Sequence, residues 1–110
     1  MASTFKNAVS ASVGSSTTSV YTVPSATTTT VIGITISNIT ASDITVDIAV
    51  TDTSATTTVY LLKGATVSVG GALVPIGGDQ KVVLEATDII KVTSSAASSA
   101  DVIVSVLEQP

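Results

Sequence analysis

Residues 43–51, DITVDIAVT, carry an apolar side chain at every second position. The apolar positions are Ile44, Val46, Ile48 and Val50. Because successive side chains of a strand point to opposite faces, this alternation predicts a β-strand with one buried face and one solvated face. The segment is long and contains no proline, so we expect it inside a sheet rather than at an edge.

The amino-acid composition extends this prediction to the whole chain. Of 110 residues, 35 are Ser or Thr, 45% are hydrophobic and only 3% are aromatic. Thr, Val and Ile have a branched Cβ that favours the pleated surface of a sheet, and no stretch shows a convincing 3.6-residue period. The length fits one domain. We therefore predict a single all-β domain with an aliphatic core.

Turn signals recur about every ten residues, which is typical of an antiparallel sandwich or small barrel. The expected strands are 18–23, 31–38, 43–51, 58–63, 66–69, 72–76, 81–85, 88–94 and 101–108. Pro75 lacks an amide donor, so its strand belongs at an edge. Residues 1–17 show no sustained period and are expected to form an extended N-terminal arm, with at most one helical turn near residues 5–12. The sandwich domain then spans residues 18–110.

Several functional classes are disfavoured by the residues that are missing. The sequence contains no His, Cys, Trp or Arg, and its net charge is −4. Four lysines do not form a basic stripe, so we expect no nucleic-acid partner. The longest apolar stretches are too short to cross a bilayer, and the N-terminus lacks an apolar run of signal-peptide length. We expect a product made in the cytoplasm that acts without a membrane.

Clustered acidic residues raise the possibility of a calcium site, because hard cations prefer carboxylate oxygens. Asp43 and Asp47 stand four residues apart on one predicted strand, hence about 13 Å apart at ~3.3 Å per residue. Asp52 opens a turn, where Asp commonly accepts hydrogen bonds from nearby backbone amides. The favoured interpretation is therefore structural, and we expect no bound metal and no cofactor.

Glu85 and Asp88 bracket a tight connection, and a pair of carboxylates could perform acid–base chemistry. No nucleophile, oxyanion donor or aromatic wall accompanies them in the sequence. Serines without a neighbouring base are ordinary hydroxyls, and Lys63, Lys81 and Lys91 are expected to point to water. We predict no catalytic residue and no enzymatic activity.

Three further features have structural interpretations that we favour. The paired glycines at 70–71 and 77–78 lack the strand-to-helix context of a phosphate loop and are expected in hairpins. Asn38 begins the glycosylation pattern NIT, which matters only in a secreted eukaryotic protein. Tyr21 and Tyr60 are expected to be core residues with the hydroxyl at the rim rather than a platform for sugars.

Over residues 18–108 the chain resembles small virion structural proteins of tailed bacteriophages, with cyanophages and other aquatic phages as the nearest source. The shared features are VYTVP, TVIGITISN, LLKGATV, VPIGG and a hairpin that ends in VIVSVLE. Their order is the informative part. The glycine usual in the hairpin turn is replaced by Thr87, which leaves the turn type open. The resemblance implies an immunoglobulin-like sandwich used as a repeated accessory part of the particle, and it carries no catalytic residues. A jelly-roll-like sandwich is the other architecture that we expect.

The leading hypothesis is a structural component of a tailed-phage virion, either a capsid decoration or cement protein or a neck–tail adaptor. It would dock on major capsid, neck or tail proteins and on copies of itself, with the arm at 1–17 reaching a neighbouring subunit. The alternative is a receptor- or carbohydrate-binding sandwich module of a tail fibre. A secreted hydrolase accessory domain is a third option, disfavoured by the missing signal segment.

Overall fold

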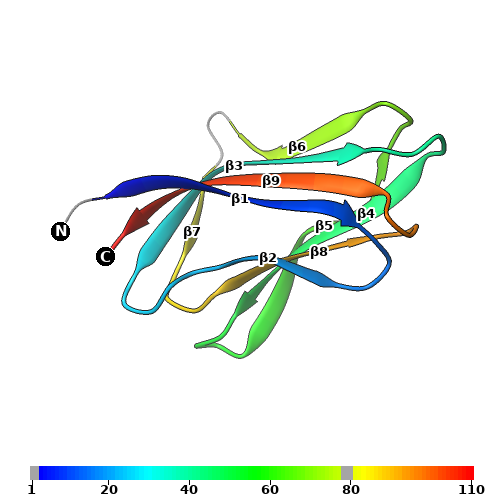
Figure 1. Cartoon of the computed structure of the whole chain (residues 1–110). Helices are drawn as coiled ribbons and strands as arrows, with labels where there is room; N and C mark the ends of the chain where they lie inside the picture. The colour runs from blue at the N-terminus through cyan, green and yellow to red at the C-terminus, as the bar shows by residue number, and fades with distance from the viewer. Residues whose placement is uncertain (1–2, 78–80) are drawn as a thin grey trace.

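In the computed structural model, which describes residues 3–77 and 81–110, all regular secondary structure is β-strand (Figure 1). The strands are β1 (Thr4–Val13), β2 (Thr18–Thr22), β3 (Thr28–Asn38), β4 (Ile44–Asp52), β5 (Thr57–Val67), β6 (Ala72–Ile76), β7 (Val82–Leu84), β8 (Ile89–Ser94) and β9 (Ala100–Gln109). Every pairing among them is antiparallel. The prediction of an all-β antiparallel domain is confirmed.

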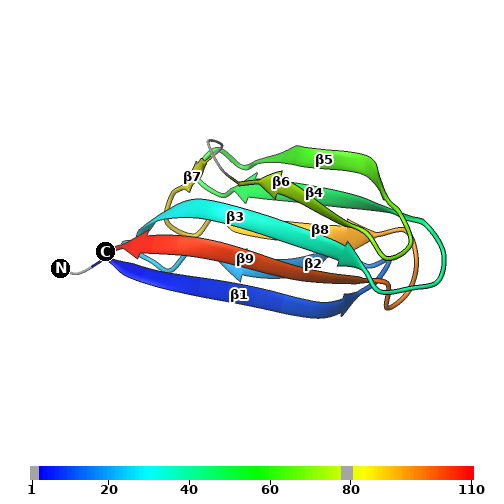
Figure 2. The same cartoon turned by 90° about the horizontal axis from the view of Figure 1, so that it is seen from above.

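The strands form two sheets packed face to face, as Figure 2 shows from above. The first sheet has the order β1-β9-β3-β6, with β7 pairing the same side of β3 as β6, and the second has the order β2-β8-β4-β5. The pairing is nested along the chain: β1 pairs β9, β2 pairs β8, β3 pairs β6 and β7, and β4 pairs β5. The expected sandwich architecture is therefore present.

The core between the sheets consists of aliphatic side chains from both layers. Strand β4 lies inside the second sheet, as expected, and buries Ile44, Val46, Ile48 and Val50. On the opposite face of β4, Ala49 is also buried, directly across from Tyr60 on β5. Each fully buried Val or Ile stabilises the fold by about 1.5–3 kcal/mol, so this core needs no cross-link.

The expected N-terminal arm is instead an edge strand of the sandwich. Residues 4–10 pair with β9 in continuous register, from Thr4 opposite Glu108 to Ser10 opposite Val102. The boundary predicted after residue 17 is wrong for residues 4–13, and so is a helical turn near residues 5–12; residues 1–2 lie outside the described part. The strand was missed because its large apolar side chains, Phe5 and Val9, are exposed rather than buried.

Residues 58–63 and 66–69 were expected as separate strands, but both belong to β5. Gly64 adopts φ of +66°, and its N–H donates to Asp47 Oδ1 at 2.7 Å. The register between β4 and β5 shifts at this point, since Val46 faces Ala65 while Ile48 faces Leu62. A glycine in the left-handed region is typical of a β-bulge, so the expected break is a bulge within a continuous strand.

The edge position expected for Pro75 is confirmed, and a turn is present at Gly70 and Gly71 as expected. Pro75 lies on β6, at the edge of the first sheet. Before it, Gly70 has φ of +71° and the N–H of Gly71 donates to the Ser68 carbonyl at 2.8 Å, which closes a turn. This turn links β5 of the second sheet to β6 of the first, so the expectation of a hairpin at residues 70–71 is wrong. Of the second expected turn, residues 78–80 lie outside the described part of the chain.

Thr87 adopts φ of +70°, a backbone conformation that glycine occupies most readily. Asp88 N–H donates to the Glu85 carbonyl at 3.1 Å across this turn. A β-branched residue in the left-handed region is strained. The turn therefore has the backbone conformation typical of glycine although threonine occupies it. The Thr87 hydroxyl forms a hydrogen bond with the Thr53 hydroxyl on the neighbouring loop.

Candidate functional site

The outward face of the first sheet carries the most exposed large apolar side chains of β1 and β9. Phe5 is 75% exposed, Val9 67% and Ile103 42%. Leu107 lies on the same face, half-buried, and Val83 of β7 continues it at the far side of the sheet. We call these five residues the outer apolar face. Exposed apolar clusters of this kind mark interaction surfaces.

The register of the sheet arranges this face in cross-strand rows. One row contains Phe5, Leu107, Thr30 and Val83, each opposite the next on β1, β9, β3 and β7. A second row contains Val9, Ile103 and Thr35. Between them lies a row of small or polar residues, Asn7, Ser105 and Gly33. Directly opposed side chains are close enough to form continuous apolar stripes.

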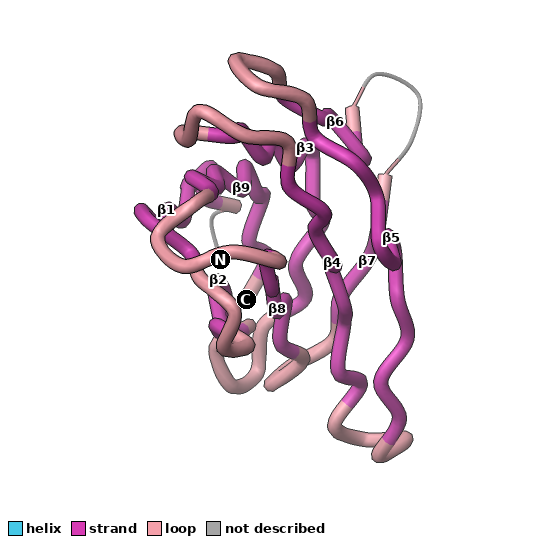
Figure 3. Tube along the Cα trace, turned by 90° about the vertical axis from the view of Figure 1, so that its right-hand side faces the viewer, coloured by secondary structure: helices cyan, strands magenta, loops and turns pink. Residues whose placement is uncertain are grey.

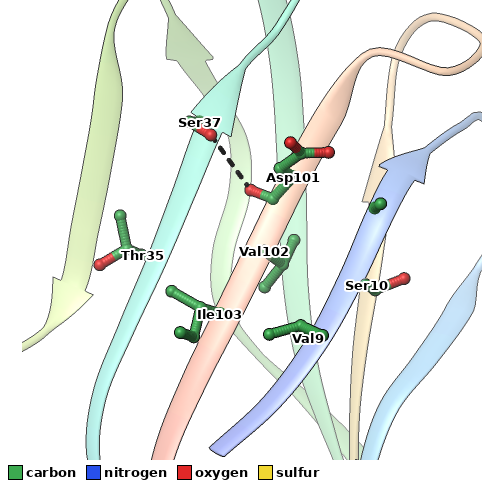
Figure 4. A pocket seen from close by; sticks show the side chains of 8 residues that line it. Val9, Ser10, Thr35, Ser37, Asp101, Val102 and Ile103 are labelled. Atoms are coloured by element: carbon green, nitrogen blue, oxygen red, sulfur yellow. Dashed lines mark hydrogen bonds between the residues drawn. The ribbon is translucent and has the colours of Figure 1, made fainter.

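Figure 4 shows the second row from close by, where Val9 and Ile103 stand on adjacent strands. They border a shallow pocket of about 260 Å³ that also reaches Thr35, Ser37 and Asp101. The Ser37 hydroxyl donates to the Asp101 carbonyl at 3.5 Å. The pocket is open and mostly apolar, which suits a flat packing partner better than an enclosed small molecule.

Apart from Val83, which stands between the exposed Lys81 and Glu85 along the chain, the outer apolar face is almost free of charge. Along β1, β9 and β3 its one ionisable side chain is Asp101, at the end of the face, whose Oδ1 accepts the Ser12 N–H at 2.9 Å. Lys6 lies on the opposite face of β1 and pairs Glu108. Burying this surface therefore removes little charge from water, which keeps the desolvation cost of docking low.

The sequence signal for this face was the period-two pattern Phe5, Asn7, Val9 and Ala11 in the first strand. This pattern is short and is surrounded by small and polar residues, so residues 1–17 as a whole show no sustained period. Here the inward positions hold smaller or polar residues, with Ala8 packed against the core. Exposure on this face could be recognised only once the register with β9 was known.

The three aspartates considered for calcium are not brought together. Asp43 Oδ1 accepts the Val69 N–H at 3.0 Å, and Asp47 accepts Gly64 N–H and the Lys63 amine. Asp52 Oδ1 accepts the N–H groups and hydroxyl of its own turn. These hydrogen bonds, led by the one from the Ser54 hydroxyl, lower the pKa of Asp52. The structural interpretation fits each residue.

Asp52 instead meets the predicted acid pair Glu85 and Asp88, with a carboxylate oxygen of each within 4.8 Å of the others. Asp88 is buried, and it accepts the Glu85 N–H at 2.9 Å and the Thr53 N–H at 3.3 Å. Glu85 is exposed. The expectation of two solvated acids is therefore wrong for Asp88, whose carboxylate holds two loops together. Sequence spacing could not reveal the approach of Asp52, which comes from another turn.

Tyr21 is partly buried with its hydroxyl at the rim, as expected. The hydroxyl donates to Glu108 Oε2 at 2.6 Å, and Lys6 Nζ lies 2.9 Å from the other oxygen. Burial, followed by this hydrogen bond, raises the pKa of Tyr21 to about 12. The hydrogen bond from Tyr21, and then that from Lys6, lowers the pKa of Glu108. This cluster joins β2, β9 and β1 at one end of the sandwich.

Tyr60 was expected in the core, but it is 53% exposed on the outer face of the second sheet. Lys63 Nζ lies 4.6 Å from its ring centroid and 3.2 Å from Asp47 Oδ2. The hydrogen bond to Asp47 is the main cause that raises the pKa of Lys63. Position 60 faces outward because it lies opposite Ala49, on the side of β4 away from the core, and a second register shift separates it from Leu62, which lies opposite the core residue Ile48.

The lysines that were expected to point to water and the NIT pattern at Asn38 can both be located in the structure. Lys63 and Lys81 are exposed and Lys91 is half-buried. Asn38 is buried, and its Nδ2 donates to the carbonyls of Ser42 and Val67 at 2.8 and 3.0 Å. Its amide therefore fastens a loop inside the fold, which favours the structural interpretation of the NIT pattern.

No family model matches the chain, and no curated protein matches it either. In the part of the chain that the structure describes, no helix has the length and apolar character needed to span a membrane.

Proposed function

We propose that the chain is a structural component of a tailed-phage virion, a repeated accessory subunit that decorates or cements the capsid or joins neck and tail. The observation that carries this proposal is the outer apolar face, which groups exposed apolar side chains with little charge along β1, β9 and β3 of a β-sandwich without disulfides. The sequence resemblance to small phage virion proteins supports the same function. Localisation in the virion and synthesis in the host cytoplasm follow from it.

The strand order supports a jelly-roll assignment within this proposal. In a jelly roll, a long antiparallel hairpin of strands is rolled into two four-stranded layers, and the nested pairing β1–β9, β2–β8, β3–β6/β7 and β4–β5 fits this arrangement. An immunoglobulin sandwich instead has the order ABED on one sheet and CFG on the other. Jelly rolls are common in viral capsid domains, which agrees with a role in the particle.

A second copy of the chain is the partner that the outer apolar face fits best. The Phe5–Leu107 row and the Val9–Ile103 row lie at equal distances, about 7 Å, on either side of the Asn7–Ser105–Gly33 row. A twofold axis along the middle row would place each apolar row against the other row of the partner. Such an isologous contact is self-complementary and buries no like charges at its centre.

The experiment that tests the function is the copy number of the chain in purified particles of the phage that encodes it. Gel densitometry against the major capsid band is expected to give hundreds of copies for a capsid protein. Six, twelve or a small multiple is expected for a neck or tail protein. Absence of the chain from washed particles would contradict the proposal.

The alternative, a receptor- or carbohydrate-binding module, is favoured by one observation. Tyr60 exposes an aromatic ring beside Asp47 and Lys63, a combination that can stack on a sugar and bond its hydroxyls. A glycan array probed with the wild-type chain and with Tyr60→Ala tests this alternative. Binding that the substitution removes would favour it over the assembly role, and a blank array would count against it.

A further inference from the structure

The sandwich has an opening on the side away from β1 and β2. The second sheet ends at β5, and the facing edge of the first sheet is formed there by β7, a strand of three residues. A pocket of about 380 Å³ lies between the two strands. Its walls include Val59 and Leu61 of β5 and Val82 and Leu84 of β7. We call this pocket the β5–β7 seam.

The seam exposes apolar side chains that belong to the interior of the sandwich. Val59 lies opposite the buried Val50 on β4, so it shares the core-facing side of the sheet, yet it is 53% exposed. Leu61 and Val82 are half-buried beside it. Among the residues that the structure describes, no side chain covers this part of the core, which therefore reaches the surface.

Strand β5 also has a free edge along the seam. Its hydrogen-bonded neighbour in the second sheet is β4, and Figure 3 shows β5 at one side of the molecule with no further strand of that sheet outside it. Thr57, Val59 and Leu61 line the seam at alternate positions. Residues 57–60 pair with β4 in continuous register. The free edge of a strand presents N–H and C=O groups that can template an added strand.

The charge of the seam is confined to one end and is negative. Asp52 and Asp88 line the pocket at the end marked by Thr57, and Glu85 lies within 4.8 Å of both. None of the lysines lines the pocket. An occupant that is apolar along its length and cationic at this end would match both features of the seam.

We propose that the β5–β7 seam accepts an extended segment of a partner polypeptide that pairs with the edge of β5. The segment carries two aliphatic residues at alternate positions, which fill the space beside Val59 and Leu61, and a Lys or Arg that reaches Asp52 and Glu85. Alternate side chains of a strand are about 7 Å apart and point to one face, so backbone pairing and side-chain insertion occur together.

The polarity of the segment follows from the fold. Strand β5 runs from the acidic end of the seam toward Val67. An added strand that is antiparallel, like every other pairing in this domain, ends at the carboxylates. Its basic residue therefore follows the aliphatic ones in the sequence. This inference concerns a different surface from the outer apolar face and stands or falls separately from the proposed function.

The test uses the full-length, ¹⁵N-labelled chain and the synthetic peptide STVTVTKTS, which has valines at alternate positions followed by a lysine. We expect saturable amide shifts at Thr57–Leu61 and Val82–Leu84, with the amides of β1 unchanged. A peptide with Glu in place of Lys is expected to bind about tenfold more weakly, because it meets the carboxylates with like charge. A peptide with adjacent valines, STTVVKTTS, should bind no better than the Glu peptide.

Matched variants locate the site. Val59 is exposed, so Val59→Lys should leave the chain folded and abolish the shifts, whereas Val9→Lys on the outer apolar face should leave binding unchanged. Asp52→Asn combined with Glu85→Gln should remove the preference for Lys over Glu. The proposal is overturned if no peptide saturates up to about 1 mM, if the Lys and Glu peptides bind equally, or if calcium alone shifts the same amides and blocks the peptide.

Discussion

Val9 of β1 lies directly opposite Ile103 of β9, and both side chains point away from the core. Two exposed aliphatic residues in register on adjacent strands give the domain an apolar surface beside an already complete core. Stability and docking thus rest on opposite faces of the same sheet. Substitutions on the outer apolar face should therefore change association without changing folding.

If the outer apolar face docks on a second copy, the isolated chain should self-associate in solution. Val9→Lys places a charge in one of the two apolar rows of the proposed twofold contact, and we expect it to shift the chain toward monomer. The free energy of unfolding should change by less than about 0.5 kcal/mol, because Val9 is 67% exposed. Light scattering after size-exclusion chromatography measures the first quantity and urea unfolding the second. Val69→Lys, at an exposed valine in the turn after β5 of the other sheet, is the control that should leave the mass unchanged.

The core-facing side of β4 should be intolerant of truncation. Ile48 is fully buried, and Ile48→Ala is expected to cost about 2–5 kcal/mol of stability, while Ile48→Asp should unfold the chain. Thr45 is exposed on the other face, so Thr45→Ala should cost less than about 0.5 kcal/mol. Urea midpoints compare the variants, and equal losses at both positions would contradict the assigned faces.

Replacing Thr87 with glycine should raise the stability of the fold. Thr87→Gly removes the strain of a β-branched residue at φ of +70° and is expected to stabilise the fold by about 0.5–1 kcal/mol, after loss of the hydroxyl contact with Thr53. Thr87→Ala loses the same hydroxyl and keeps the positive φ, so it should be less stable than the wild type. A glycine variant no more stable than the alanine variant would show that the turn is unstrained.

Stability should fall in alkali because of Tyr21. Its pKa is raised from 10.0 to about 12 in the folded chain, so the native state holds this proton more tightly than the unfolded state does. That contribution is complete below pH 10 and is lost as the pH rises toward 12. Urea unfolding at several pH values should show a smaller alkaline loss for Tyr21→Phe. Tyr60→Phe, which leaves the Tyr21–Glu108 hydrogen bond intact, should keep the wild-type slope.

At low pH the cluster of Tyr21, Glu108 and Lys6 should make stability fall with acid, because Glu108 is the group that then changes its ionisation. The folded-state pKa of Glu108 is below its ordinary value of 4.5, so the unfolded state takes up the proton first. The stabilisation is present above the ordinary pKa and is lost as the pH falls through the folded-state value. Glu108→Gln should flatten this acid dependence in urea unfolding measured between about pH 5 and pH 2. An unchanged acid profile would show that the Tyr21 and Lys6 contacts do not bias its ionisation.

The sequence predicted those parts of the fold in which side-chain polarity follows burial. The alternation at Ile44–Val50 located an interior strand, and Pro75 located an edge. Prediction failed where apolar side chains are exposed instead of buried, as at Phe5 and Val9 of β1. It also failed at Gly64, where a hydrogen bond to Asp47 on another strand turns an apparent break into a bulge.

The candidate surfaces depend on relations that no local pattern contains. The outer apolar face exists because β1 and β9, far apart in the chain, pair so that Val9 meets Ile103. Asp52 joins Asp88 because the β4–β5 turn and the loop before β8 meet at one end of the sandwich. Pairing across long sequence separations, rather than composition, decides which residues share a surface.

The central claim is that the outer apolar face joins the chain to a phage particle as a repeated subunit. Its most direct test is the number of copies per purified particle when the phage carries either the wild-type chain or a Phe5→Lys, Val9→Lys double variant. We expect a symmetric multiple for the wild type and almost none for the variant, with the variant still folded in the lysate. Equal incorporation of both chains, or the absence of the wild-type chain from particles, would contradict the claim.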